Sequence, residues 1–193
     1  MKDDKEFDEI DREWERCAAV LGPAIERAFP VVLMDDDTLQ QIIGEISPPR
    51  NGVLSKIFSL FNVEFEFYDD ELLEFVKILA DQNWRQIDWN VHWQVVPLFT
   101  ETVLAYCLPG LMLEYVMGTF DFGLITWETQ VRDSLFPAIV PSDPNRLDMN
   151  RFTKEQKRVI ADFVSALRDL TFFDNPELQN MADAIVGQLN DSQ

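Results

Sequence analysis

Histidine, cysteine and glycine, which most often mark catalytic or cofactor sites, are scarce in this 193-residue chain. The single histidine, His92, lies between tryptophans, which is typical of a packed structural residue, although a Ser–His or Cys–His pair formed through the fold stays open. One histidine and two distant cysteines, Cys17 and Cys107, cannot complete a tetrahedral zinc site, and both cysteines are expected to be buried. The glycines form no phosphate-binding loop. The sequence therefore predicts no catalytic residue, no cofactor and no metal.

Carboxylates are abundant, and three groups of them could do chemistry. The run Asp35, Asp36 and Asp37 could attract a divalent cation, but it lacks the spacing of an EF-hand and is more typical of a helix N-cap. Glu101 and Glu114 interrupt an apolar stretch, so burial could raise their pKa values for acid–base work. Their ordinary interpretation is a solvent-facing or hydrogen-bonded position.

The third group is an acidic strip that contains no lysine or arginine. It is interleaved with Phe65, Phe67 and Tyr68, and consists of Glu64, Glu66, Asp69, Asp70, Glu71 and Glu74. Such a strip can bind a basic protein with the aromatic side chains as anchors, and Asp35, Asp36 and Asp37 could extend it. The competing interpretation is a solvated surface that only aids solubility.

The whole chain is strongly acidic, with a net charge of −19 and a pI near 4.2. This charge opposes direct binding to nucleic acid or to anionic membranes. The N-terminal residues show no signal-peptide pattern, which predicts a cytoplasmic protein. The apolar residues 95–117 are interrupted by Glu101, Glu114, Pro97 and Pro109, so we expect a central buried helix and not a membrane span.

Apolar residues recur at helical spacing along most of the chain, which predicts an all-α single domain over residues 1–193. The pattern favours a bundle of seven or eight helices around a central helix that is kinked at Pro109. Expected N-terminal signals are Asp35 to Thr38, Asp69 with Asp70, Thr100, the capping box of Thr153 with Gln156, and Asn175 before Pro176. Residues 31–34 are expected to be a short extended or turn segment. Pro23 could bend or split the first helix.

Three further elements are predicted from local pattern. Residues 53–61 and 126–136 are expected to form helices, and residues 137–150 a proline-rich loop. Strict alternation over residues 63–67 is the one strand-like signal, as an edge ribbon or as the lead-in to the next helix.

Short motifs between residues 28 and 170 resemble a family of small, uncharacterised bacterial proteins known as a domain of unknown function. They are Ala28-Phe29-Pro30, Trp84, Phe99-Thr100 with Tyr106-Cys107-Leu108-Pro109, and Phe152-Thr153-Lys154-Glu155-Gln156. Glu101 stands where that family has proline. The resemblance implies a compact helical domain in a bacterium, and it supplies no catalytic residue.

Two classes of function are compatible with these observations. The first is an acidic binding protein that neutralises a basic partner, such as an immunity protein against a bacterial nuclease toxin, with a DNA-mimic inhibitor as a neighbouring version. The second is an enzyme or small-ligand domain with a pocket beside Trp84 to Trp93 and the expected kink at Pro109.

Overall fold

The protein is described from a computed structural model that covers residues 4–46, 66–92, 95–96, 99–117, 148–170 and 176–191. Of these residues 82% are α-helical, and none of them forms a strand. The predicted all-α class is therefore confirmed. The described residues contain six helices of eleven residues or more, while the predicted helices at 53–61 and 126–136 lie outside them, so the number of seven or eight stays a prediction.

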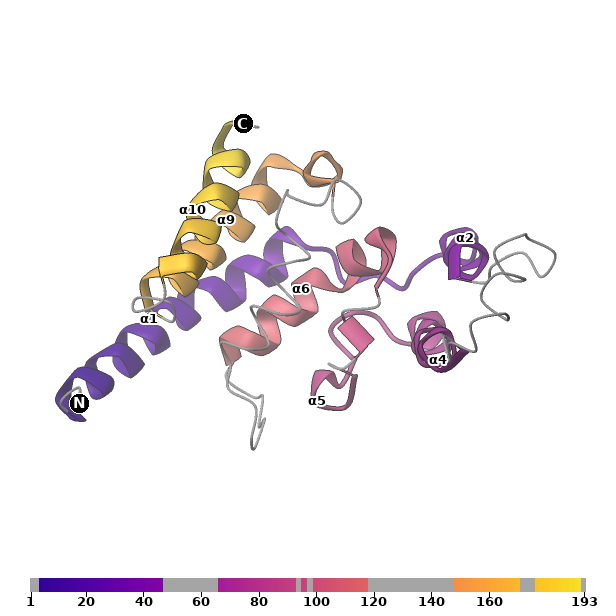
Figure 1. Cartoon of the computed structure of the whole chain (residues 1–193), viewed down its shortest axis with the longest axis horizontal. Coiled ribbons are helices and arrows are strands. Elements are labelled where there is room, and N and C mark those ends of the chain that lie inside the picture. Colours follow the sequence, from indigo (N-terminus) through magenta and orange to yellow (C-terminus); the bar gives the residue numbers. More distant parts are fainter. Residues whose placement is uncertain are drawn as a thin grey trace.

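The helices form three groups. Their bounds are α1 (Asp4–Ala28), α2 (Asp36–Ile46), α4 (Glu66–Asp81), α5 (Trp89–His92), α6 (Glu101–Met117), the 3-10 helix η3 (Met149–Arg151), α9 (Lys154–Leu170) and α10 (Pro176–Asp191). Figure 1 shows α1, α9 and α10 packed together on one side and α2 beside α4 on the other. Helix α6 lies between these groups and contacts α1 and α5.

Helix α6 is the buried centre of the fold, as predicted. Thr100 caps it, because the Val103 N–H donates to the Thr100 hydroxyl at 3.4 Å. Ten of its residues are buried on all sides of the helix, including Pro109 and Gly110, and the helix continues through both. The kink expected at Pro109 stays a prediction. Within the described residues, no helix combines the length and the apolar character needed to cross a membrane.

Gly110 allows two tryptophans to pack directly against α6. A Cβ atom at this position would lie 2.6 Å from the Trp84 carbonyl oxygen and 2.7 Å from Trp89 Nε1. Both tryptophans are 2% exposed and belong to the core. The absence of a side chain on Gly110 is therefore what brings the segment between α4 and α5 onto the central helix.

Side-chain caps fix the starts of α2 and α9 as predicted. Asp35 accepts the Thr38 N–H at 2.9 Å and the Thr38 hydroxyl at 2.8 Å. In the capping box, Thr153 accepts the Gln156 N–H at 3.3 Å, and Gln156 accepts the Thr153 N–H at 2.9 Å. Helix α1 runs unsplit through Pro23, which is exposed, so water can satisfy the carbonyl that lacks an N–H partner.

Two local predictions need correction, and one open alternative is decided. Glu66 and Phe67 are the first residues of α4, so for them the lead-in to the next helix holds and the edge ribbon does not. Asp69 and Asp70 accordingly lie inside the helix and do not cap it. Met149 and Asn150, predicted as loop, open η3, where the Asp148 carboxylate accepts the Asn150 N–H at 2.9 Å. Residues 63–65, 137–147 and Asn175 lie outside the described residues.

Candidate functional site

The acidic helix pair, α2 and α4, concentrates negative charge at one end of the molecule (Figure 1). Its two helices contain three and six acidic residues respectively, against one lysine. Helix α9, by contrast, contains three acidic and four basic residues. The two packed helices therefore combine acidic groups that lie about thirty residues apart in the sequence.

Several acidic side chains outside this pair have a cationic partner. Arg27 pairs with Glu155, Arg85 with Glu26, and Arg168 with both Asp169 and Asp183. Within the described part of the chain, five exposed carboxylates have no ion pair or hydrogen bond, and these are Glu15, Asp36, Asp37, Glu71 and Asp81. Four of the five belong to the acidic helix pair, so its charge is the least compensated in the described structure.

The carboxyl ends of these two helices lack the basic residues that would stabilise them. The carboxyl end of a helix is stabilised by lysine or arginine, because the helix dipole is negative there. Neither α2 nor α4 has a basic residue in its last turn, and α4 ends on Asp81. Asp36 and Asp37, in the first turn of α2, do match the dipole.

Asp35 is used by the fold. Hydrogen bonds from the Thr38 backbone N–H and hydroxyl hold the pKa of Asp35 below its ordinary value. Because both carboxylate oxygens already accept from Thr38, the residue is a cap and not a free ligand. Among the described residues, no group of three or more histidine, cysteine or carboxylate side chains is arranged to hold a metal ion.

The predicted acidic strip lies largely on α4. Glu66, Asp69 and Asp70 belong to its N-terminal part, and Glu64 lies outside the described residues. Glu71 and Glu74 are exposed, but Glu74 forms an ion pair with Lys77. Of the predicted aromatic anchors, Phe67 and Tyr68 are in the helix and Phe65 lies outside the described residues. Among the side chains that the structure describes, Glu71 is therefore the carboxylate of the strip that is exposed and without a partner.

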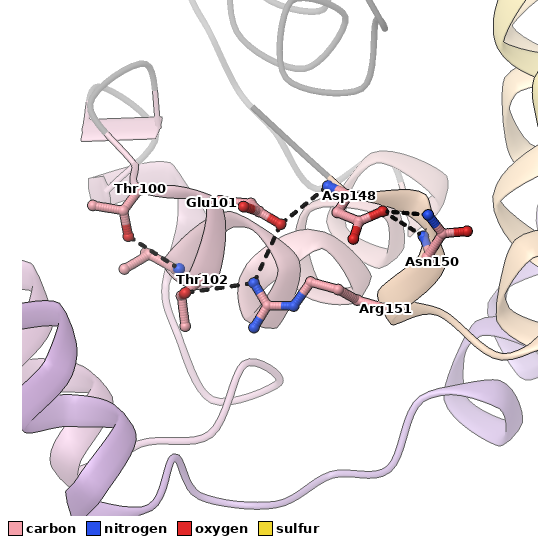
Figure 2. Close-up of polar contacts among 7 residues, drawn as sticks. Thr100, Glu101, Thr102, Asp148, Asn150 and Arg151 are labelled. Carbon is pink, nitrogen blue, oxygen red and sulfur yellow. Dashed lines mark hydrogen bonds and ion pairs between the residues drawn. The ribbon is translucent and has the colours of Figure 1, made fainter. Parts of the chain in front are cut away.

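Glu101, a candidate acid or base in the sequence, joins two distant elements. Figure 2 shows its carboxylate pointing toward Asp148 and Arg151. One oxygen accepts the Asp148 N–H at 3.1 Å and an Arg151 Nη1–H at 3.4 Å. Arg151 also lies 3.5 Å from the Thr102 hydroxyl. These contacts tie the first turn of α6 to η3, so Glu101 has the hydrogen-bonded role that the sequence also allowed. Glu114 is half-buried.

The remaining candidates for chemistry are packed side chains. The His92 ring lies 5.5 Å from that of Phe75, and its side chain is half-buried. Cys107 is fully buried and Cys17 half-buried, and both are free thiols. Burial raises the pKa of the Cys107 thiol well above its ordinary value. Burial, with Glu13 and Asp169 nearby, also raises the pKa of Cys17, so neither thiol is activated as a nucleophile.

Sequence reasoning missed how the connecting segment, residues 30–34 between α1 and α2, is held. Trp84 Nε1 donates to the Pro30 carbonyl at 3.1 Å, and the Tyr106 hydroxyl donates to the Val32 carbonyl at 2.7 Å. Burial is the main influence on the pKa of the Tyr106 phenol, and the nearby backbone N–H groups of Trp84 and Met34 act against it. Burial raises the pKa of Tyr106 to about 12, which keeps the phenol protonated as a donor.

A cavity of about 310 Å³ lies beside the connecting segment. Trp84, Tyr106, Pro109 and Arg151 contribute to its lining, so a pocket exists next to Trp84 and Pro109, as the small-ligand hypothesis requires. Its polar groups are already engaged, because Tyr106 and Arg151 bond to Val32 and Glu101, and Gln156 donates to the Ala28 carbonyl at 3.2 Å. The geometry thus favours a structural role for these side chains over ligand binding.

Comparison with protein-family models, with curated proteins and with solved structures finds no match for this chain. The resemblance to a bacterial family of unknown function stays a prediction.

Proposed function

We propose that this protein is an acidic binding protein that neutralises a basic protein partner through the acidic helix pair. This proposal rests on one observation, which is where the carboxylates without an ion pair lie. Four of the five exposed carboxylates that have no partner in the described structure lie on α2 and α4. Uncompensated like charges repel one another, so their clustering becomes favourable only when cations arrive.

Asp81 is exposed at the end of α4, where a basic partner can reach it. A solvated acidic surface can place its charges anywhere, whereas a carboxylate on the last residue of α4 opposes the helix dipole. A basic partner reverses this cost, because its lysine or arginine side chains can pair with Asp81 and with the free carboxylate of Glu71. The exposed N-terminal turn of α2, with Asp36 and Asp37, provides further contacts.

A bacterial toxin of the nuclease class is the partner that fits this charge best. Nucleases present basic surfaces to nucleic acid, and a net charge of −19 accelerates their capture by electrostatic steering. An inhibitor of this kind is an immunity protein. If it covers the nucleic-acid site, double-stranded DNA should compete with it for the toxin, which is also the behaviour of a DNA mimic.

The test compares two variants of equal charge. The basic partner is first captured on the immobilised wild-type protein and purified. Its association rate is then measured with the variant Glu71→Lys/Asp81→Lys and with the control Glu15→Lys/Asp162→Lys, which lies on α1 and α9. We expect the first variant to associate about tenfold more slowly at low salt and the control to match the wild type. The difference should shrink at ~0.5 M salt, where the Debye length is about 4 Å.

Equal rates for the two variants would show that only total charge matters, and the proposed surface would be wrong. Inhibition is measured separately on the purified partner. A partner that binds through α2 and α4 and keeps its full activity would contradict the immunity function.

A further inference from the structure

The connecting segment has two edges that differ in hydrogen bonding. In an extended chain, the N–H and C=O groups of alternate residues point to the same side. The carbonyls of Pro30 and Val32, which accept from Trp84 and Tyr106, are two residues apart and follow this period, and the Met34 N–H lies near the Tyr106 oxygen. They form an inner edge that side chains of the fold satisfy. The backbone groups of Val31 and Leu33 must then form the outer edge.

The outer edge has no partner within the described part of the chain. Neither Val31 nor Leu33 takes part in a backbone hydrogen bond there, and their side chains are 42% and 54% exposed. Two N–H and two C=O groups are therefore unpaired there, in residues that are exposed and apolar. An unpaired, apolar, extended edge is a template on which another chain can add a strand.

The charge around this edge favours a basic occupant. The three arginines of neighbouring elements, Arg27, Arg85 and Arg151, are each paired with a glutamate. Asp36 and Asp37, which follow the segment after Asp35, have no ion pair within the described residues. A second copy of this chain would bring another charge of −19 to the same place, so like-charge repulsion opposes self-pairing.

We infer that an extended segment of the basic partner pairs with the outer edge of residues 30–34 as an added strand, with its lysine or arginine side chains directed to Asp36 and Asp37. This inference rests on the proposed function and specifies its docking mode. Backbone hydrogen bonds with Val31 and Leu33 fix the register of the added strand. The exposed Val32 and Leu33 side chains contact alternate apolar residues of the partner.

The test uses a synthetic heptapeptide of alternating lysine and valine with blocked ends, and the same peptide methylated on every backbone nitrogen as its matched control. Both peptides have the same charge and side chains, but the methylated one cannot donate backbone hydrogen bonds. Binding is followed by titration, and amide exchange of Val31 and Leu33 by NMR. We expect the unmodified peptide to bind about tenfold more tightly and to slow exchange at both amides by about tenfold or more.

A protein variant gives the reciprocal test. Leu33→Pro removes one outer N–H, and proline restricts Val32 to the extended conformation that it already needs. We expect this variant to melt near the wild-type temperature and to lose the preference for the unmodified peptide. If it does not fold, Val31→Pro tests the same edge.

The outcomes separate the inference from the proposed function. Equal binding of both peptides, lowered in Glu71→Lys/Asp81→Lys, would overturn strand addition and leave the acidic binding surface in place. Binding of neither peptide, with a natural partner that is indifferent to Glu71→Lys/Asp81→Lys, would overturn both. Slow exchange at Val31 and Leu33 without peptide, in a concentration-dependent dimer, would make a second copy the occupant and overturn the inference.

Discussion

The hydroxyl of Tyr106 donates a 2.7 Å hydrogen bond to the carbonyl of Val32, which lies 74 residues earlier in the chain. The bond fixes the middle of the connecting segment to the central helix. Trp84 makes the equivalent bond to Pro30, two residues before Val32. The shape of the proposed docking edge is therefore set by two aromatic side chains that belong to other elements.

Replacing Tyr106 with phenylalanine should loosen this segment without unfolding the protein. The change removes one hydrogen bond and leaves the ring packed, so the free energy of unfolding should fall by about 0.5–1.5 kcal/mol. Val32 is 55% exposed, and water can therefore replace part of what its carbonyl loses. Denaturant unfolding measures the stability, and faster amide exchange at Met34 should accompany its loss. Unchanged exchange at Met34 would show that the segment is held by other contacts.

The contribution of Tyr106 should disappear at high pH. Burial raises its pKa from 10.0 to about 12, so the folded protein favours the neutral phenol. Its stabilising effect is complete below pH 10 and is lost as the pH rises through 12. The difference in stability between wild type and Tyr106→Phe should shrink over this window. Absorbance titration of tyrosinate should show one late-titrating group that the variant lacks, and a Tyr106 that titrates at its ordinary pKa would contradict the prediction.

Gly110→Ala should destabilise the protein strongly, although alanine favours the helical conformation more than glycine does. The new methyl group would lie 2.6 Å from the Trp84 carbonyl oxygen, and the resulting shift should cost about 1–3 kcal/mol. Gly187→Ala in α10 is the matched control, since nothing lies within 4 Å of its Cβ position. That change should stabilise the protein by about 0.5–1 kcal/mol. Melting temperatures of the two variants that move in the same direction would contradict this packing.

Asp81→Lys should make the protein more stable and its association with the basic partner slower. Lysine at the end of α4 matches the helix dipole, so the free protein should gain about 0.3–1 kcal/mol. The same change removes a carboxylate from the acidic helix pair, so association with the basic partner should slow. Unfolding and association rates are measured on the same preparation. A variant that is more stable and binds as fast as the wild type would assign Asp81 no role in binding.

Local signals allowed the sequence to predict the helix starts at Asp35, Thr100 and Thr153, since each cap and its partner lie within three residues. The alternation at residues 63–67 left strand and helix lead-in open, because a pattern of five residues is too short to decide between them. Glu66 and Phe67 are helical. The acidic strip was visible as composition, but which carboxylates are free depended on ion pairs such as Glu74 with Lys77. The hydrogen bond that fixes the connecting segment was not predictable, because nothing near Val32 in the sequence indicates that Tyr106 is its donor.

The contacts that hold the connecting segment also determine when it can form. Its bonds from Trp84 and Tyr106 close loops of 54 and 74 residues. Closing long loops delays contacts during folding, and a ribosome releases the N-terminal residues first. The edge is thus encoded early in the chain and completed only after α6 has been synthesised. A nascent or partly folded chain does not present it, so partner recognition is restricted to the finished molecule.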